Sequence, residues 1–125
     1  MIVGLGMDLV RIARIDGFVR RRGDAALRRV FTPAEQARCA ASRAPSESLA
    51  ARFAAKEAFF KALGTGWGPG GRWTEVEVVS SSTGAPSLRL WGRAAQAAAE
   101  RGVARIHLSL THSDDTAAAV VVLES

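Results

Sequence analysis

The chain has 125 residues, which is enough for one domain, and we expect residues 1–125 to form a single domain around a small core. Hydrophobic residues make up 48% and charged residues 23%, a composition that is typical of a folded globular protein and excludes a disordered one. No apolar run approaches the roughly 20 residues of a membrane span, and the N-terminus lacks the pattern of a signal peptide, so we predict a cytoplasmic protein. The single cysteine excludes an internal disulfide, and two histidines are too few to favour zinc over a hard cation held by carboxylates.

Positive charge is concentrated in one third of the sequence. The formal net charge is +5, and the segment 11–43 carries nine arginines against three acidic residues, which gives +6 there and −1 elsewhere. A concentrated basic surface indicates an acidic partner, either nucleic acid, a phosphorylated ligand or an acidic protein. The alternative is a solvated face in an arginine-rich chain, since Lys56 and Lys61 are the only lysines among 17 basic residues.

Residues 2–10 alternate in hydrophobicity with the period of a β-strand. One face carries Val3, Leu5, Met7 and Leu9, and the other carries Gly4, Gly6, Asp8 and Val10. The glycines leave room for the close approach of another backbone or of a ligand. An acid among apolar neighbours is costly unless it is paired or bound to a metal, so Asp8 is a candidate ligand, or else a cap for the segment that follows.

Three helices are predicted next along the chain. The first begins at Asp16, is interrupted near Gly23 and resumes as far as Val30. The second follows the sequence TPAE at 32–35, in which Thr32 and Glu35 fit a capping box. The third and longest runs from about 46 to 63 and ends at Gly64.

The second half of the chain changes to the period of strands. Strands are predicted at 74–79 and 87–91 around a hairpin turn, an alanine-rich helix follows and ends at Gly102, and two further strands flank the turn at 113–115. Because short turns join neighbouring strands, we expect an α+β fold with a largely antiparallel sheet packed against a long central helix.

The long helix has two different faces. Its apolar stripe consists mostly of small residues, namely Ala51, Ala54, Ala55, Ala58, Phe59, Ala62 and Leu63. The other side carries Phe53, Glu57 and Lys61, with Lys56 and Phe60 beside them. A Glu–Lys pair at i and i+4 is by itself an ordinary surface pair that contributes about 0.2–0.5 kcal/mol. A functional role requires a second acid, for which Asp8 is the candidate, and a phosphate near the glycines that follow Gly64.

The strand at 105–112 places Arg105, His107, Ser109 and Thr111 on one face. Such a face can bind an anion, and an edge strand with one solvated face explains the alternation equally well. Nothing in the sequence fixes a Ser/His/Asp triad.

Three segments together resemble one family. They are GLGMDLVRI at 4–12, ARFAAKEAFFKALGTG at 51–66, and HLSLTH at 107–112 followed by AAAVVVLE at 117–124. Their order and spacing resemble those of holo-[acyl-carrier-protein] synthase, the small bacterial-type 4′-phosphopantetheinyl transferase family. The resemblance covers essentially the whole chain, and FTPAE at 31–35 also matches the family's F-[ST]-x-x-E element.

The resemblance implies transfer of the phosphopantetheine arm from coenzyme A to a serine of an acyl carrier protein, in fatty acid or polyketide synthesis, with adenosine 3′,5′-bisphosphate released. It implies Mg²⁺ held by Asp8 and Glu57, a catalytic Lys61, and homotrimers whose sites form where two subunits meet. Coenzyme A contacts would fall on Arg52, Lys61, Gly64, Thr65, Gly66, Pro86, His112 and Ser113. The acidic carrier protein would dock on Arg14, Phe18, Arg21, Arg22 and Arg28.

The residue types fit this chemistry. Mg²⁺ prefers one or two carboxylates together with phosphate oxygens and water, and Lys61 lies one turn from Glu57, where it can neutralise developing phosphoryl charge. For the general base we weigh a metal-polarised water against a carboxylate and favour a carboxylate–water arrangement around Glu57.

Two other classes of protein compete with the transferase. A small nucleic-acid-binding protein would use the arginine-rich third, but the sequence has no RNA-binding motif, and such a protein has no use for Asp8 and Glu57. A non-catalytic oligomeric scaffold would leave the polar face of the long helix unexplained. We therefore predict an enzyme without nucleic-acid or membrane partners.

Overall fold

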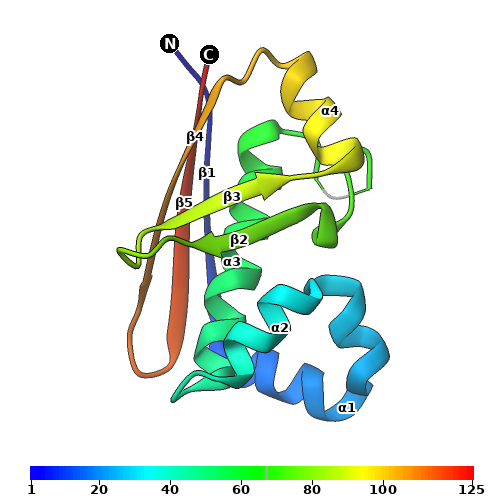
Figure 1. Ribbon diagram of the computed structural model, residues 1–125, viewed down its shortest axis with the longest axis vertical. Coiled ribbons are helices and arrows are strands. Elements are labelled where there is room, and N and C mark those ends of the chain that lie inside the picture. The colour runs from blue at the N-terminus through cyan, green and yellow to red at the C-terminus, as the bar shows by residue number, and fades with distance from the viewer. Residues whose placement is uncertain (67) are drawn as a thin grey trace.

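A computed structural model describes residues 1–66 and 68–125. The elements in chain order are β1 (Ile2–Arg11), α1 (Ile12–Val30), α2 (Pro33–Ala40), α3 (Pro45–Leu63), the 3-10 turn η1 (Trp73–Glu75), β2 (Val76–Ser80), β3 (Pro86–Leu90), α4 (Gly92–Glu100), β4 (Arg105–His112) and β5 (Thr116–Glu124). Figure 1 shows α3 beside the long strands, with the β2–β3 hairpin crossing them and the two termini close together. None of the described helices is long and apolar enough to cross a membrane.

The α+β architecture with antiparallel strands is confirmed, and the strands form two sheets. The larger sheet has the order β1-β5-β4, and the smaller one consists of β2 and β3. All three strand pairings are antiparallel. The strand predicted at 74–79 corresponds to β2, which begins only at Val76 because residues 73–75 form the 3-10 turn η1.

Helix α3 packs directly against β1 because of two glycines. A Cβ atom at Gly4 would meet the carbonyl oxygen of Ala62, and one at Gly6 would meet that of Ala58. The prediction that these glycines admit a close backbone is thus confirmed, and the backbone is that of α3. Small residues on both elements bring the helix axis close to the sheet.

The ends and breaks of the helices agree with the predictions from local sequence, with one exception. The capping box of Thr32 and Glu35 is present at the start of α2, and Gly64 ends α3 in the left-handed conformation. Gly23 interrupts α1 at φ 73°, as predicted. The prediction that Asp16 begins α1 is wrong: the helix begins at Ile12, and Asp16 lies inside it, where it pairs with Arg20 and accepts a hydrogen bond from Ser46.

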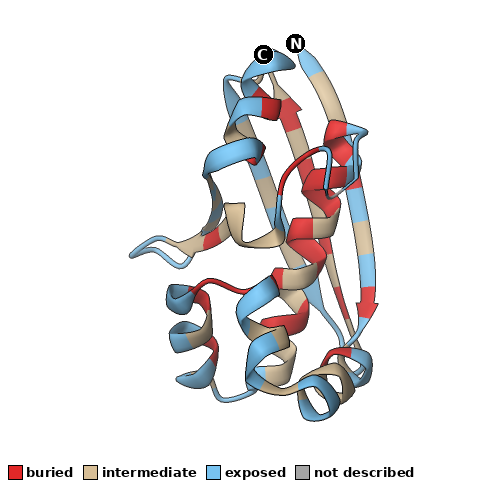
Figure 2. Ribbon diagram, turned by 90° about the vertical axis from the view of Figure 1, so that its right-hand side faces the viewer, coloured by how far each residue is buried: buried red, intermediate tan, exposed pale blue. Residues whose placement is uncertain are grey.

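Both sides of α3 are covered, which corrects the two-faced description drawn from periodicity. Figure 2 shows buried residues along most of its length. The small stripe lies against the sheet as expected, but Lys56 and Phe60, placed beside Glu57 on the polar side, are also buried. The reason is a second layer, made of α2 and β2, on the side of α3 that faces away from the large sheet.

The opposite face of the large sheet is apolar and exposed along β1. Leu5, Met7 and Leu9 of β1 are 56–67% exposed. On β5 they lie opposite Val122, Val120 and Ala118, and the next positions across, on β4, are His107, Ser109 and Thr111. The outer face therefore grades from apolar at β1 to polar at β4.

The close approach of α3 to β1 gives a direct test. We expect Gly6→Ala to lower the free energy of unfolding by about 1–3 kcal/mol or more, because its Cβ would overlap the fixed carbonyl oxygen of Ala58. Urea unfolding followed by circular dichroism would measure the change.

Gly17→Ala is the matched control for this substitution. Its Cβ would meet only the flexible end of the Arg21 side chain, and alanine is favoured by about 0.5–1 kcal/mol inside a helix. Equal stability of the two variants would contradict the tight contact between β1 and α3.

Candidate active site

Asp8 and Lys61 come from different elements and form an ion pair. The Lys61 Nζ lies 2.9 Å from Asp8 Oδ1 and donates to the Met7 carbonyl oxygen at 3.1 Å. The Asp8 side chain is 15% exposed and that of Lys61 is 55% exposed. Among the described residues, the ion pair formed by Lys61 therefore runs across to Asp8 on β1 rather than to Glu57 on the same helix, so the alternative of an ordinary helical surface pair is not supported.

Glu57 belongs to the same electrostatic cluster. Burial raises the pKa of its carboxyl above the ordinary value, and the negative charge of Asp8 raises it further. The charges of Lys61 and Arg14 and the side chain of Trp73 act in the opposite direction. Two carboxylates that repel each other, with cationic side chains next to them, form a site suited to a bound cation and to proton transfer.

Glu57 lines a wide cleft. This cleft has a volume of about 680 Å³ and lies between α1, α3 and η1. Its lining comprises Arg14, Ile15, Phe18, Arg22, Ala25, Ala26, Arg29, Val30, Phe31, Phe53, Glu57 and Trp73. Three of the residues predicted to dock a carrier protein, Arg14, Phe18 and Arg22, thus share a cleft with a predicted catalytic acid. Arg21 and Arg28 are exposed on α1 outside that lining.

A smaller cleft of about 230 Å³ brings Arg52 and His112 together. Arg52 is buried, its Nη1 donates to the Ser48 hydroxyl at 2.7 Å, and its Nε is buried without a hydrogen-bond partner in the described structure. The His112 Nε2 lies 3.1 Å from Glu47 Oε1. Ser113 lies in the adjoining turn, where its hydroxyl donates to Asp115.

The remaining predicted coenzyme A contacts lie elsewhere on the chain. Gly64 and Thr65 follow the C-terminal end of α3, whereas Glu47, the partner of His112, lies in its first turn. Gly66 follows Thr65 and accepts a hydrogen bond from its hydroxyl. Gly64 lies 17 positions after Glu47, which corresponds to about 25 Å along a helix. Pro86 begins β3, opposite Ser80. Within the predicted glycine-rich stretch, Trp67 lies outside the described residues.

Asp8 and Glu57 fit a magnesium ion better than a transition metal. No group of three or more His, Cys, Asp or Glu side chains occurs among the described residues in an arrangement that could hold a metal. The chain therefore offers two carboxylates, and burial, followed by the charge of Asp8, raises the pKa of Glu57. Mg²⁺ is commonly held by one or two carboxylates and completes its shell with water and phosphate oxygens.

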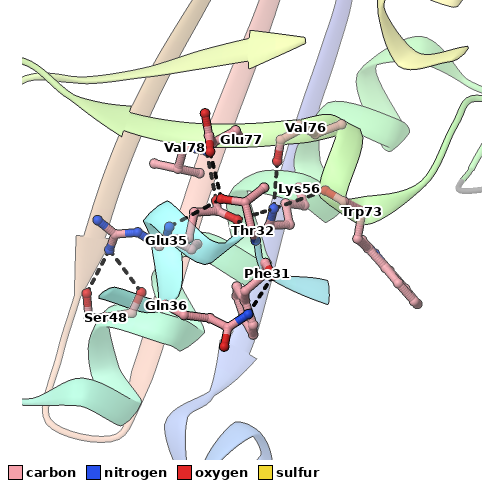
Figure 3. Close-up of polar contacts among 11 residues, drawn as sticks. Phe31, Thr32, Glu35, Gln36, Ser48, Lys56, Trp73, Val76, Glu77 and Val78 are labelled. Atoms are coloured by element: carbon pink, nitrogen blue, oxygen red, sulfur yellow. Dashed lines mark hydrogen bonds and ion pairs between the residues drawn. The ribbon is translucent and has the colours of Figure 1, made fainter. Parts of the chain in front are cut away.

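Sequence reasoning missed a buried ion pair behind the site. Figure 3 shows Lys56 surrounded by polar partners, with its Nζ 2.7 Å from Glu35 Oε1. The sequence marks Glu35 only as a capping residue and places Lys56 only on a face of the helix. The available signal was the rarity of lysine in this chain, with both lysines on one helix.

Comparison with known proteins identifies the family. The family described as the 4′-phosphopantetheinyl transferase superfamily matches residues 4–121. The chain therefore belongs to the 4′-phosphopantetheinyl transferase superfamily and is an enzyme of that class.

Relatives and solved structures narrow the class. Holo-[acyl-carrier-protein] synthase from Trichlorobacter lovleyi is 49% identical over 100% of this chain and 99% of its own, and that from Anaeromyxobacter dehalogenans strain 2CP-C is 52% identical over 99% and 97%. The crystal structure of the Neisseria meningitidis synthase has a TM-score of 0.92 at 34% identity and covers 100% of both chains. The Helicobacter pylori synthase in complex with coenzyme A has a TM-score of 0.85 at 32% identity, covering 96% and 99%. Within the superfamily the chain belongs with the holo-[acyl-carrier-protein] synthases.

Proposed function

We propose that the protein transfers the 4′-phosphopantetheine arm of coenzyme A to a serine of an apo acyl carrier protein, with Mg²⁺, in support of fatty acid or polyketide synthesis. The observation that carries the proposal is the convergence of Asp8, Glu57 and Lys61 beside a cleft lined with arginines of α1. The relatives named for this activity, and the coenzyme A complex of one of them, support the choice of substrates.

In the proposed reaction the serine oxygen attacks the phosphorus that bears the pantetheine. The pyrophosphate bond breaks, adenosine 3′,5′-bisphosphate leaves, and the serine proton passes to a base. Asp8 and Glu57 would hold the magnesium ion, whose chemical contribution is to neutralise the charge of the pyrophosphate.

The side chains of this chain have separate tasks in that step. Lys61, with its side chain more than half exposed, can reach a phosphate oxygen and offset negative charge in the transition state. Glu57 is the proposed base, directly or through a water molecule, because it lines the cleft that would receive the serine hydroxyl.

We assign the arginine face of α1 to carrier-protein docking. Arg14 and Arg22 line the cleft one turn on either side of Phe18, and Arg21 and Arg28 are exposed. A positive surface around an apolar side chain suits an acidic helix. A serine presented on such a helix would reach the cleft that contains Glu57.

We also propose a homotrimer in which each active site is completed by a second subunit. The outer face of β1 exposes Leu5, Met7 and Leu9 in a row, and contiguous apolar surface of this kind marks a protein interface. Arg52 and His112 lie toward the end of α3 that is remote from Gly64, so one subunit spreads its proposed coenzyme A contacts over two ends of a helix. Association would bring the contacts near Gly64 of one subunit together with Arg52 and His112 of another.

The central prediction concerns transfer itself. Incubation with apo carrier protein, coenzyme A and Mg²⁺ should add the mass of the phosphopantetheine arm, and a chelator should abolish the gain. Glu57→Gln and Asp8→Asn should each reduce turnover at least about 100-fold, since even second-shell changes at metal sites cost 10–100-fold.

Glu100→Gln serves as the control for charge removal, because Glu100 pairs on the surface with Arg93. Its turnover should equal that of the unchanged protein. Full activity of Glu57→Gln or Asp8→Asn would refute the metal assignment.

Docking is tested by reversing charge on α1 away from the cleft. Arg21→Glu with Arg28→Glu should raise the KM for the carrier protein about tenfold and weaken its salt dependence, because exposed charges act mainly on encounter. The KM for coenzyme A should stay constant. Arg14 is left unchanged because its charge also lowers the pKa of Glu57. An equal rise in both KM values would show that α1 is not a separate docking surface.

Assembly is tested by sedimentation. The unchanged protein should sediment as a trimer, and Met7→Glu with Leu9→Glu should dissociate it by placing charge in the apolar row of β1. The dissociated protein should lose transfer. A stable and fully active monomer would rule out a shared site.

A further inference from the structure

Lys56 is a fully buried cation whose three N–H donors are all used. Its Nζ contacts Glu35 Oε1 at 2.7 Å, the Trp73 carbonyl oxygen at 3.0 Å and the Val76 carbonyl oxygen at 2.6 Å. Its side chain is 0% exposed. A lysine ammonium has three donors, so the hydrogen-bonding capacity of this group is satisfied by protein atoms.

Glu35 is buried and satisfied in the same way. Its Oε1 accepts from the Thr32 amide at 2.9 Å as well as from Lys56, and its Oε2 accepts from the Val78 amide at 2.8 Å. The Thr32 hydroxyl extends the network by donating to Glu77 Oε2 at 2.7 Å. Figure 3 shows these bonds joining α2, α3 and β2 around the Glu35–Lys56 ion pair.

The network holds the wall of the larger cleft. The Trp73 carbonyl accepts from Lys56, while the Trp73 side chain lines the cleft with Glu57 and lies 6.1 Å from the Phe53 ring between centroids. Phe31 lines the same cleft, and the Lys56 ammonium lies 5.7 Å from the centroid of its ring. Two aromatic wall residues are thus fixed from behind by the same cation, which neighbours Glu57 on α3.

A buried ion pair is a poor way to gain stability, because apolar side chains of similar volume hold elements together at least as well. It is an effective way to fix geometry, since each charge demands particular partners at hydrogen-bond distance. Here those partners are main-chain atoms of η1 and β2, which an apolar contact could not hold in register with α3.

We propose that Glu35 and Lys56 are positioning residues for the active site, because their ion pair fixes η1 and Phe31 so that Trp73 is held against Glu57. The role in transfer rests on the proposed function, whereas the effect on Trp73 does not. Neither residue touches the reacting groups, and both act through the wall of the cleft.

The test combines turnover with the fluorescence of Trp73. In a background with Trp67→Phe and Trp91→Phe that retains transfer, Lys56→Met should increase acrylamide quenching of Trp73 in protein without metal or coenzyme A. In the same protein kcat should fall about 10- to 100-fold, the cost of a displacement of about 1 Å at a reacting group, with little change in the KM for coenzyme A. Glu35→Gln should reproduce both effects, and the double variant should be no worse than the poorer single one.

Leu123→Ala is the matched control for lost packing. Leu123 is fully buried on β5 and takes no part in the network, so its truncation should lower stability and leave Trp73 quenching and kcat unchanged. All variants are compared at a temperature at which circular dichroism shows them folded. Lys56→Gln, which keeps an amide donor for the carbonyls, replaces Lys56→Met if the latter does not fold.

Three results would overturn the proposal. They are unchanged quenching in Lys56→Met, equal loss of kcat in Leu123→Ala, and multiplied losses in the double variant. If the unchanged protein does not transfer phosphopantetheine, the proposed function fails, and the quenching measurement still decides whether the ion pair fixes Trp73.

Discussion

The contact on which the candidate active site depends is the close approach of α3 to β1. Gly4 and Gly6 present no side chain to the carbonyl oxygens of Ala62 and Ala58, so the helix backbone lies against the strand. Lys61 then projects over the edge of β1 and reaches Asp8 at 2.9 Å. A larger residue at either glycine would separate the two elements that supply Asp8, Glu57 and Lys61.

Helix α3 is fixed from its other side by a different kind of interaction. The side of α3 that faces the sheet packs through mostly small apolar side chains. The side that faces α2 and β2 buries the charge of Lys56 against Glu35. Burial lowers the pKa of Lys56, and the carboxylate of Glu35 acts against that shift. Removal of one member of such a pair typically costs about 3–5 kcal/mol, so the pair strongly constrains how α2 and η1 lie on the helix. Glu57 lies on α3 between the side packed on the sheet and the side packed on α2 and β2. This position explains how a half-buried acid is held at the edge of a cleft.

Local chemistry made much of the fold predictable. The capping box at Thr32, the left-handed Gly64, the break at Gly23 and the alternation of β1 and β4 each depend on residues close in sequence. The predicted start of α1 at Asp16 is wrong, because the helix begins directly after β1, at Ile12, without a side-chain cap that the sequence could reveal. The grouping of strands into two sheets depends on long-range pairing, for which the sequence has no local signal.

For the site, the sequence by itself determined which residue types are available: two carboxylates, a rare lysine, an arginine-rich helix, and glycines that permit a close backbone contact. Only the tertiary structure decided their partners. Lys61 pairs with Asp8 rather than with its helical neighbour Glu57, and Lys56 points into a second packed layer that periodicity cannot reveal. The physical reason is that spacing along a helix fixes the direction of a side chain, whereas its partner and its burial depend on elements distant in sequence that pack around it.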